Sequence, residues 1–176
     1  MLLLAGVVIG LLAGLATGGK IGNVARLDFR WPWVVLVALL IREAAVITPL
    51  SRVEGIQYVY AAALAALVAW TAWHVRRVPG VWVVMVGSAL NLIVVLANGA
   101  RMPVSAALAP NLVARGHAGQ YAVMGPGTRL DWLGDWIGIP GPLGGAYSPG
   151  DLCIGLGIAI VAFLATRHRG AATTAG

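Results

Sequence analysis

Residues 81–98 read VWVVMVGSALNLIVVLAN, eighteen positions without a charged side chain. A helix needs about 20 apolar residues to cross the roughly 30 Å hydrocarbon core of a bilayer, so this stretch predicts a membrane span. Four other apolar runs approach that length, at residues 1–17, 32–50, 56–75 and 151–166. The sequence therefore predicts an all-α fold, a polytopic transmembrane helical bundle of about five spans.

The composition agrees with lipid as the solvent. Apolar residues make up 60% of the 176 positions, whereas charged residues make up only 10%, against roughly 25% in a soluble domain. No basic residue precedes the first run, so we expect a retained span there and not a secretory signal. We expect one transmembrane domain over residues 1–169 and a disordered tail over residues 170–176.

The basic residues are divided unequally between the ends of the predicted spans. Seven of the twelve follow the first, third or fifth span: Lys20, Arg26, Arg30, Arg76, Arg77, Arg167 and Arg169. Cytoplasmic loops carry an excess of Lys and Arg. We therefore expect a multi-pass membrane protein with its N-terminus outside and its C-terminus in the cytoplasm. The net charge of +6 then reflects orientation, and membrane lipid, not nucleic acid, is the expected partner.

Glycines recur every four residues in the first run, at Gly6, Gly10, Gly14 and Gly18. Small residues on one helix face allow two helix backbones to approach closely. We expect this face to pack against another helix of the chain. The alternative is a docking face for a further membrane subunit or a second copy.

The segment 99–150 is the long connection on the outer side, and its mixed composition predicts that it packs on the membrane face. Within it, residues 128–137 have the pattern of a short interfacial helix, with Thr128 and Asp131 as a capping box. In the span before it, Asn91 and Asn98 need partners, because an unsatisfied amide in hydrocarbon costs several kcal/mol. They indicate either an interhelical hydrogen bond or the polar wall of an outward-opening pocket.

Charged residues of both signs gather at this outer side. The candidate binding residues are Asn91, Asn98, Arg101, Arg129, Asp131, Asp135 and Asp151. The simplest interpretation is that the three aspartates cap helix ends and form salt bridges. Another is an acid pair, Asp135 with Asp151, sharing a proton and activating water. A cation or lipid head-group site is the third.

Other chemistry finds no support in the sequence. The single cysteine, Cys153, lies in an apolar run, and the three histidines have no metal-ligand spacing. Phosphate-binding glycine loops and serine-elbow motifs are also missing. We therefore expect no metal and no cofactor.

Several motifs resemble a bacterial membrane protein family of unknown function, domain of unknown function 5317. They include NGARMPV at residues 98–104, GDWI at 134–137 and SPGD at 148–151. The resemblance implies a location in the bacterial cytoplasmic membrane and no particular activity. A weaker similarity connects SPGD and SALNLI at residues 88–93 with the lipoprotein signal peptidases, which would imply an aspartate pair. However, Val94 stands where the first aspartate of those enzymes should follow.

Three functions remain open. The leading hypothesis is a non-enzymatic accessory or assembly subunit, or a binder of a lipid or small amphiphile with a polar site at the outer face. The second is an outer-face hydrolase or peptidase that uses Asp135 and Asp151. The third is a small transporter or channel, formed by an oligomer, with a path lined by Arg42, Glu43, Asn91 and Asn98.

Overall fold

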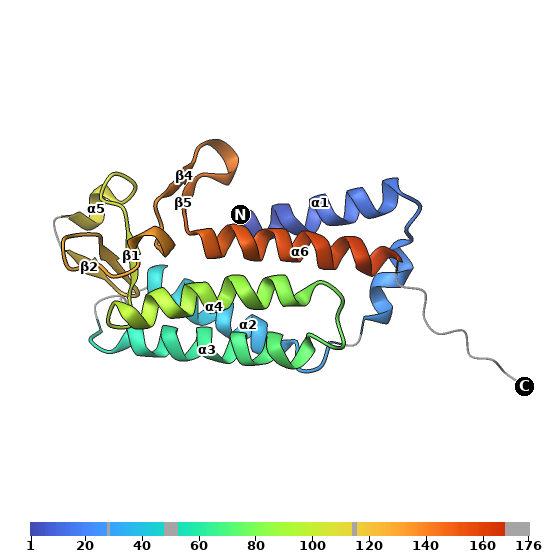
Figure 1. Ribbon diagram of the computed structural model, residues 1–176, viewed down its shortest axis with the longest axis horizontal. Helices are drawn as coiled ribbons and strands as arrows, with labels where there is room; N and C mark the ends of the chain where they lie inside the picture. The colour runs from blue at the N-terminus through green and yellow to red at the C-terminus, as the bar shows by residue number, and fades with distance from the viewer. Residues whose placement is uncertain (28, 48–52, 114–115, 168–176) are drawn as a thin grey trace, which may run out of the picture.

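The computed structural model describes residues 1–27, 29–47, 53–113 and 116–167 (Figure 1). The predicted tail 170–176 lies outside the described residues. So do the side chains of Arg42 and Glu43, although their backbone belongs to a helix. The predictions that fall on them stay predictions.

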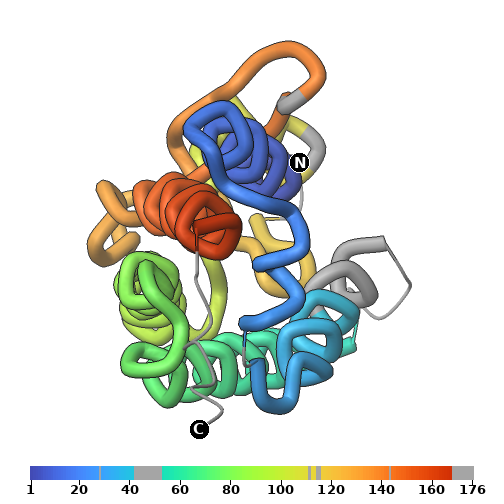
Figure 2. Tube along the Cα trace, turned by 90° about the vertical axis from the view of Figure 1, so that its right-hand side faces the viewer, coloured from blue at the N-terminus to red at the C-terminus, as the bar shows by residue number. Residues whose placement is uncertain are grey.

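Long helices dominate the molecule and lie side by side (Figure 1). Their bounds are α1 Leu2–Ala16, α2 Trp33–Ile47, α3 Ile56–His74, α4 Val81–Ala97 and α6 Pro149–Arg167, with a 3-10 helix η1 at Ile21–Arg26. In order of packing, α1 lies on α6, α6 on α4, α4 on α3 and α3 on α2. Figure 2 looks along the helices and shows this order as an open arc, with α1 and α2 at its two ends.

Two of these helices, α3 and α6, are long and apolar enough to cross a membrane. Each has 19 residues, which at 1.5 Å per residue gives about 28 Å. The helices α1 and α4 are apolar but shorter, and α2 has 15 residues. Glycines mark where two of these helices begin. The residue before α3 is Gly55 and the residue before α4 is Gly80, and both have a positive φ.

The all-α prediction is wrong for the outer segment, which contains short strands. One sheet has the order β1-β3-β2, with β1 Met102–Val104 parallel to β3 Tyr121–Val123 and β2 His117–Ala118 antiparallel to it. A hairpin joins β4 Ile137–Ile139 to β5 Gly145–Tyr147. The remaining turns are helical: α5 Pro110–Val113, η3 Asp131–Leu133 and η4 Gly141–Leu143. Six of the nine prolines lie in residues 99–150, and proline breaks the helix interior.

The predicted interfacial helix over residues 128–137 is also wrong. It reduces to the three-residue η3, after which Gly134 is extended and the chain enters β4. Pairing with β1 decides this: the backbone N–H of Asp135 donates to the carbonyl of Pro103 at 2.8 Å. The expected capping box does not form, because Thr128 Oγ1 accepts a bond from the N–H of Gly125 instead.

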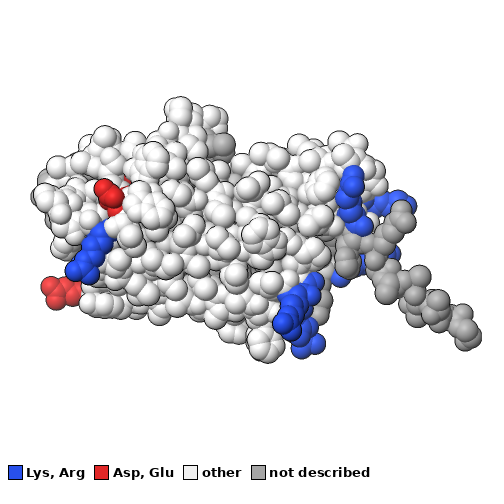
Figure 3. Space-filling model, viewed as in Figure 1, with Lys and Arg blue, Asp and Glu red and all other residues white. Residues whose placement is uncertain are grey.

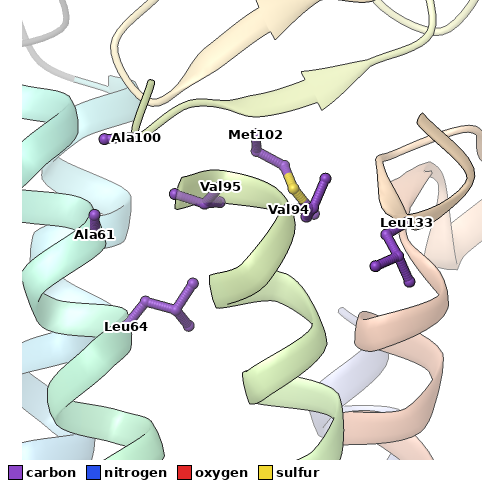
Figure 4. Packing of buried hydrophobic residues seen from close by; sticks show 7 residues of the cluster. All are labelled: Ala61, Leu64, Val94, Val95, Ala100, Met102 and Leu133. Atoms are coloured by element: carbon purple, nitrogen blue, oxygen red, sulfur yellow. The ribbon is translucent and has the colours of Figure 1, made fainter. Parts of the chain in front are cut away.

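The buried core joins the outer segment to the helices. Ala61 and Leu64 of α3 meet Val94 and Val95 of α4, while Ala100 and Met102 lie above the cluster and Leu133 lies at its side (Figure 4). Val94 and Val95 are completely buried. The strands and η3 therefore form a lid over this end of the helices, in which β1 and η3 contact α4 while β5 and η3 contact α6.

Large apolar side chains cover the outward faces of the helices. Leu4, Leu40, Ile93 and Leu156 are 62%, 68%, 51% and 59% exposed. Figure 3 shows one face of the molecule as a broad uncharged belt, with lysine, arginine and acidic side chains only towards its two ends. An apolar surface of this extent is typical of a face that meets lipid or another protein.

Candidate functional site

The first turn of α6 is closed by a capping box at Ser148–Asp151. Ser148 Oγ accepts a hydrogen bond from the backbone N–H of Asp151 at 2.9 Å. In return, Asp151 Oδ2 accepts from the N–H of Ser148 at 3.3 Å. Pro149 and Gly150 fill the two positions between, where proline suits the first helical residue. This reciprocal pair satisfies two backbone donors that the helix would otherwise leave without partners.

Asn91 of α4 completes the arrangement. Its Oδ1 accepts a bond from Ser148 Oγ at 2.8 Å, and its Nδ2 donates to Asp151 Oδ1 at 2.9 Å. Asn91 is only 4% exposed and Ser148 is fully buried. The three side chains form a closed ring of hydrogen bonds, which we call the Asn91 ring, and it locks the start of α6 to the middle of α4.

Two glycines make this close approach possible. A Cβ on Gly150 would collide with Asn91 Oδ1, and one on Gly87 would lie 2.6 Å from the carbonyl oxygen of Gly150. Both glycines are buried where α4 crosses α6. Their missing side chains bring the two backbones together, so that the short Asn91 side chain reaches the capping box.

A small pocket of about 80 Å³ opens beside the Asn91 ring. Most of its wall is apolar, and we call it the polar pocket because an amide and two carboxyl groups line it. Asn91 and Asp151 line it from α4 and α6, and Asp135 lines it from the lid. Asp135 is 5% exposed, and its backbone is fixed by the bond to Pro103 and by a bond from the N–H of Ser105 to its carbonyl at 3.0 Å. The volume suits a few water molecules, at about 30 Å³ each, or a small polar group.

The apolar chamber is a larger cavity of about 360 Å³ between the helices. It adjoins the polar pocket, because the two share wall residues Leu3, Leu39, Leu67 and Ile154. Side chains from α1, α2, α3, α4 and α6 line it, as do residues of the connection after α1. The two cavities therefore lie side by side, one long and hydrocarbon-like, the other short and lined by two carboxyl groups and an amide.

The structure separates the candidate residues that the sequence placed together. Asn91, Asp135 and Asp151 line the polar pocket, whereas Asn98 and Arg129 form a separate tie. Asn98 Nδ2 donates to the Arg129 carbonyl at 2.7 Å, and its Oδ1 accepts from the Arg129 N–H at 2.9 Å. This tie holds the lid to the end of α4.

The remaining two candidates, Arg101 and Asp131, line neither cavity. Asp131 Oδ1 accepts from the N–H of Trp132 at 2.8 Å and is exposed. Arg101 is half-buried just after the end of α4, where its N–H donates to the carbonyl of Asn98 at 3.3 Å. Both therefore act in the lid and not in the polar pocket.

The glycine face of α1 packs on α6. Gly6, Gly10 and Gly14 are buried, and a Cβ on any of them would meet α6 atoms. The prediction is wrong for the fourth glycine, Gly18. It lies beyond the end of α1, with a φ of 88° and open space around it. Gly19 takes its place, since a Cβ there would collide with Thr166.

Sequence reasoning missed Ser148 as a site residue and the two tyrosines of the pocket wall, Tyr60 and Tyr121. The spacing of Ser148 and Asp151 was the available signal, because a capping box needs its partners three residues apart. Nothing in the sequence brings Tyr60 of α3 beside Tyr121 of β3. Within the described residues no group of three His, Cys, Asp or Glu side chains is placed to hold a metal.

A sequence model of a family of unknown function, DUF5317, matches residues 26–163. The chain belongs to this family. The match spans α2, α3, α4 and the lid, and most of α6, so the DUF5317 region includes the whole Asn91 ring. No curated protein and no solved structure matches this DUF5317 chain, so the similarity to signal peptidases gains no support.

Proposed function

We propose that this DUF5317 protein is an integral membrane protein with five spans, its N-terminus outside and its C-terminus in the cytoplasm. The uncharged belt in Figure 3 supports this placement. So does the position of the cations, since Lys20, Arg26, Arg30, Arg76, Arg77 and Arg167 all follow or precede helices at the end away from the lid. An excess of Lys and Arg marks the cytoplasmic side. The shorter helices fit if the bilayer thins locally around them.

Within the membrane, the protein binds a single amphiphile. Its hydrocarbon tail occupies the apolar chamber, and its head group reaches the polar pocket at the outer face. The observation that carries this proposal is the shared wall between the two cavities. A volume of about 360 Å³ for the apolar part lies within the range of about 300–1,000 Å³ typical of ligand sites.

The groups that line the polar pocket define the head group. Asp135 and Asp151 line the pocket. The oxygens of a carboxylate offer about four acceptor sites, so Asp151 can accept a further hydrogen bond beside those from Asn91 and Ser148. A head group that donates, such as a primary amine or a hydroxyl, matches these oxygens. A phosphate placed there would face two acids, and like charges at close range repel. The ligand is therefore an amphiphile with a donating head group.

The arc of helices supports entry from the lipid. In the described part of the chain, α1 packs on α6 and α2 packs on α3, but α1 and α2 are not packed along each other. Figure 2 places them on the two sides of the opening. Both contribute walls to the chamber, through Leu3 and Val7 of α1 and Val35 and Leu39 of α2. A tail can thus enter between them without leaving the hydrocarbon.

The hydrolase alternative draws on the same pocket, because Asp135 and Asp151 both line it. An acid pair that activates water must be able to exchange a proton between its members and that water. Both oxygens of Asp151 already accept hydrogen bonds, from Asn91 and from the backbone of Ser148. This use of Asp151 as a helix cap favours binding over hydrolysis.

A photolabelling experiment tests the proposal. The purified protein is exposed to a tail-diazirine amine lipid of the sphingosine type, whose head group carries a primary amine and no phosphate, and to the matching trimethylammonium lipid. We expect stronger labelling by the amine lipid, with crosslinks in the walls of the chamber. Leu67→Trp fills the wall that both cavities share and should reduce labelling roughly tenfold, since a loss of about 1.4 kcal/mol is enough for that.

Leu156→Trp is the matched control, because Leu156 is exposed on the outward face of α6 and its labelling should not change. Asp135→Asn should abolish the preference for the amine lipid, whereas Asp131→Asn, at an exposed carboxylate outside the pocket, should retain it. Equal labelling of the two tryptophan variants would contradict the chamber as the binding site. Loss of the amine preference in Asp131→Asn as well would contradict the assigned head-group pocket.

A further inference from the structure

A second polar pocket, of about 610 Å³, lies at the end of the helices away from the lid. It is built where α1 ends, η1 follows and α6 ends. Its lining residues are Thr17, Gly18, Gly19, Lys20, Asn23, Arg26, Thr166 and Arg167. Figure 3 shows lysine and arginine gathered at this end of the visible face, without acidic side chains beside them. This pocket shares no residue with the amphiphile site.

Hydrogen bonds to the last turn of α6 fix the pocket walls. The carbonyl of Thr166 accepts from the backbone N–H of Lys20 at 2.8 Å and from Asn23 Nδ2 at 2.7 Å. The Thr166 side chain turns back to the carbonyl of Phe163 at 2.8 Å. These bonds attach η1 to the end of α6. They hold Lys20 and Arg26 near Arg167, although these residues are far apart in the sequence.

Among the described residues, Arg167 is held by contacts that leave its charge in place. Its Nη2 donates to the carbonyl of Thr17 at 2.8 Å, and its guanidinium lies 4.8 Å from the centre of the Phe163 ring. Neither contact is a carboxylate. A guanidinium has five N–H donors, so the bond to Thr17 leaves the others able to bind an anion. Arginine is well suited to phosphoryl oxygens because of its planar fork.

The charge balance of the pocket is positive. Lys20, Arg26 and Arg167 line it, and no carboxylate of the described residues does. The C-terminal ends of α1 and α6 lie here, and each contributes roughly half a negative charge, which is less than the three cations together. At physiological salt, interactions between exposed charges are largely screened beyond about 8–10 Å. An anion bound in the pocket lies closer than that to the cations, so its binding is favoured.

We propose that this pocket binds a phosphoryl group. The shared chemistry is a phosphate held by two or three cations and by the polar side chains of the rim. It belongs either to the head group of an anionic lipid or to a free phosphate in the cytoplasm. The first source fits because η1 leaves α1 at the level where a lipid head group would lie in the proposed orientation; the second fits the pocket's large volume.

Binding is measured on the full chain in lipid nanodiscs. One arm compares phosphatidylglycerol with phosphatidylcholine nanodiscs by counting lipids that stay bound in native mass spectrometry. The other titrates inorganic phosphate into phosphatidylcholine nanodiscs and follows it by calorimetry. Lys20→Gln and Arg26→Gln should each lower the affinity about fivefold, the effect of roughly one basic residue near an anionic surface.

Arg76→Gln and Arg77→Gln are the matched controls, because they remove charge at the same end of the molecule but do not line the pocket. Retention of phosphatidylglycerol alone assigns the pocket to a lipid, and binding of inorganic phosphate assigns it to a soluble ligand; either outcome supports the site. Equal losses in pocket and control variants would overturn it, because the effect would then be surface charge in general. Absence of binding in both arms would overturn it as well.

Discussion

At the residue scale, the amide of Asn91 is used in full, and that explains where it lies. An amide away from water must find partners within the protein. Asn91 does so with both ends of its side chain, accepting from Ser148 and donating to Asp151. Each of the three residues of the Asn91 ring therefore depends on the other two. Ring-like networks of this kind stabilise more than separate bonds, because each bond polarises the next.

Asn91→Ala should destabilise the protein by about 1–3 kcal/mol, the cost of leaving buried partners unsatisfied. The expected signal is a lower midpoint of thermal unfolding in detergent, followed by tryptophan fluorescence. Ser88→Ala is the matched control. Ser88 is equally buried on the same helix, and its hydroxyl has no partner among the described residues, so its loss should change stability little. A lowered midpoint in both variants, or in neither, would mean that the ring does not hold α4 and α6 together.

At this scale the sequence named three residues that lie together, but it placed the capping box at the wrong residues. Asn91, Asp135 and Asp151 were among the candidates, and all three line the polar pocket. The capping box was expected at Thr128, however, and it forms at Ser148. Both stretches have a hydroxyl residue three positions before an aspartate. Only the tertiary contacts distinguish them. The backbone of Asp135 pairs with β1, so the stretch that begins at Thr128 cannot continue as a helix.

At the element scale, backbone contact between α1 and α6 is the main support of the N-terminal helix. Gly6, Gly10 and Gly14 face Gly155, Ala159 and Thr166 across the interface. Within lipid, helices gain little from the hydrophobic effect and associate by close packing, which small residues allow. The four-residue repeat predicted this face, while the end of the helix could not be predicted. Gly18 adopts a left-handed conformation, which turns the chain towards η1.

Gly10→Leu should push α1 away from α6, because even a Cβ at Gly10 collides with the carbonyl oxygen of Ala159 and lies 2.8 Å from the Cβ of Ala162. Overpacking of this kind costs about 1–3 kcal/mol. The measurement is the rate of protease cleavage in the connection after α1, which should rise. Ala13→Leu, on the exposed face of the same helix, should behave as the wild type. Identical rates for the two variants would show that the glycine face does not carry the contact.

The outer segment marks the limit of prediction for elements. Its hydrophobic pattern near residues 128–137 fits a helix, but Gly134 and the nearby prolines allow a hairpin instead. Short strands gain their stability from pairing with distant residues, as β1 does with β3 across nineteen positions from Met102 to Tyr121. A pattern of local periodicity contains no information about such pairing. The helices were predictable because their apolar runs are long and continuous.

At the scale of the whole molecule, apolar side chains face outward along the helices and charges lie at the two ends. The two ends differ in kind: the lid end carries acids and arginines together, whereas the opposite end carries cations (Figure 3). The proposed amphiphile site lies near the first and the proposed phosphoryl site lies at the second. A phosphoryl group would be repelled from the acids, and an amine would be repelled from the cations, so each end selects its own ligand.

The orientation of α3 tests this arrangement as a whole. The helix has 19 residues, so its two ends should lie on opposite sides of the bilayer. Starting from Cys153→Ser, which keeps a donor for the carbonyl of Val83, single cysteines replace Glu54 before the helix or Arg77 after it. In intact cells an impermeant maleimide should label Glu54→Cys but not Arg77→Cys, which becomes reactive only after the membrane is opened. Labelling of Arg77→Cys in intact cells would reverse the orientation, and with it the assignment of the lid to the outer face. Labelling of both positions in intact cells would show that α3 does not cross the membrane, because both of its ends would then lie on the outer side. The six cations at the end away from the lid would then give no information on orientation.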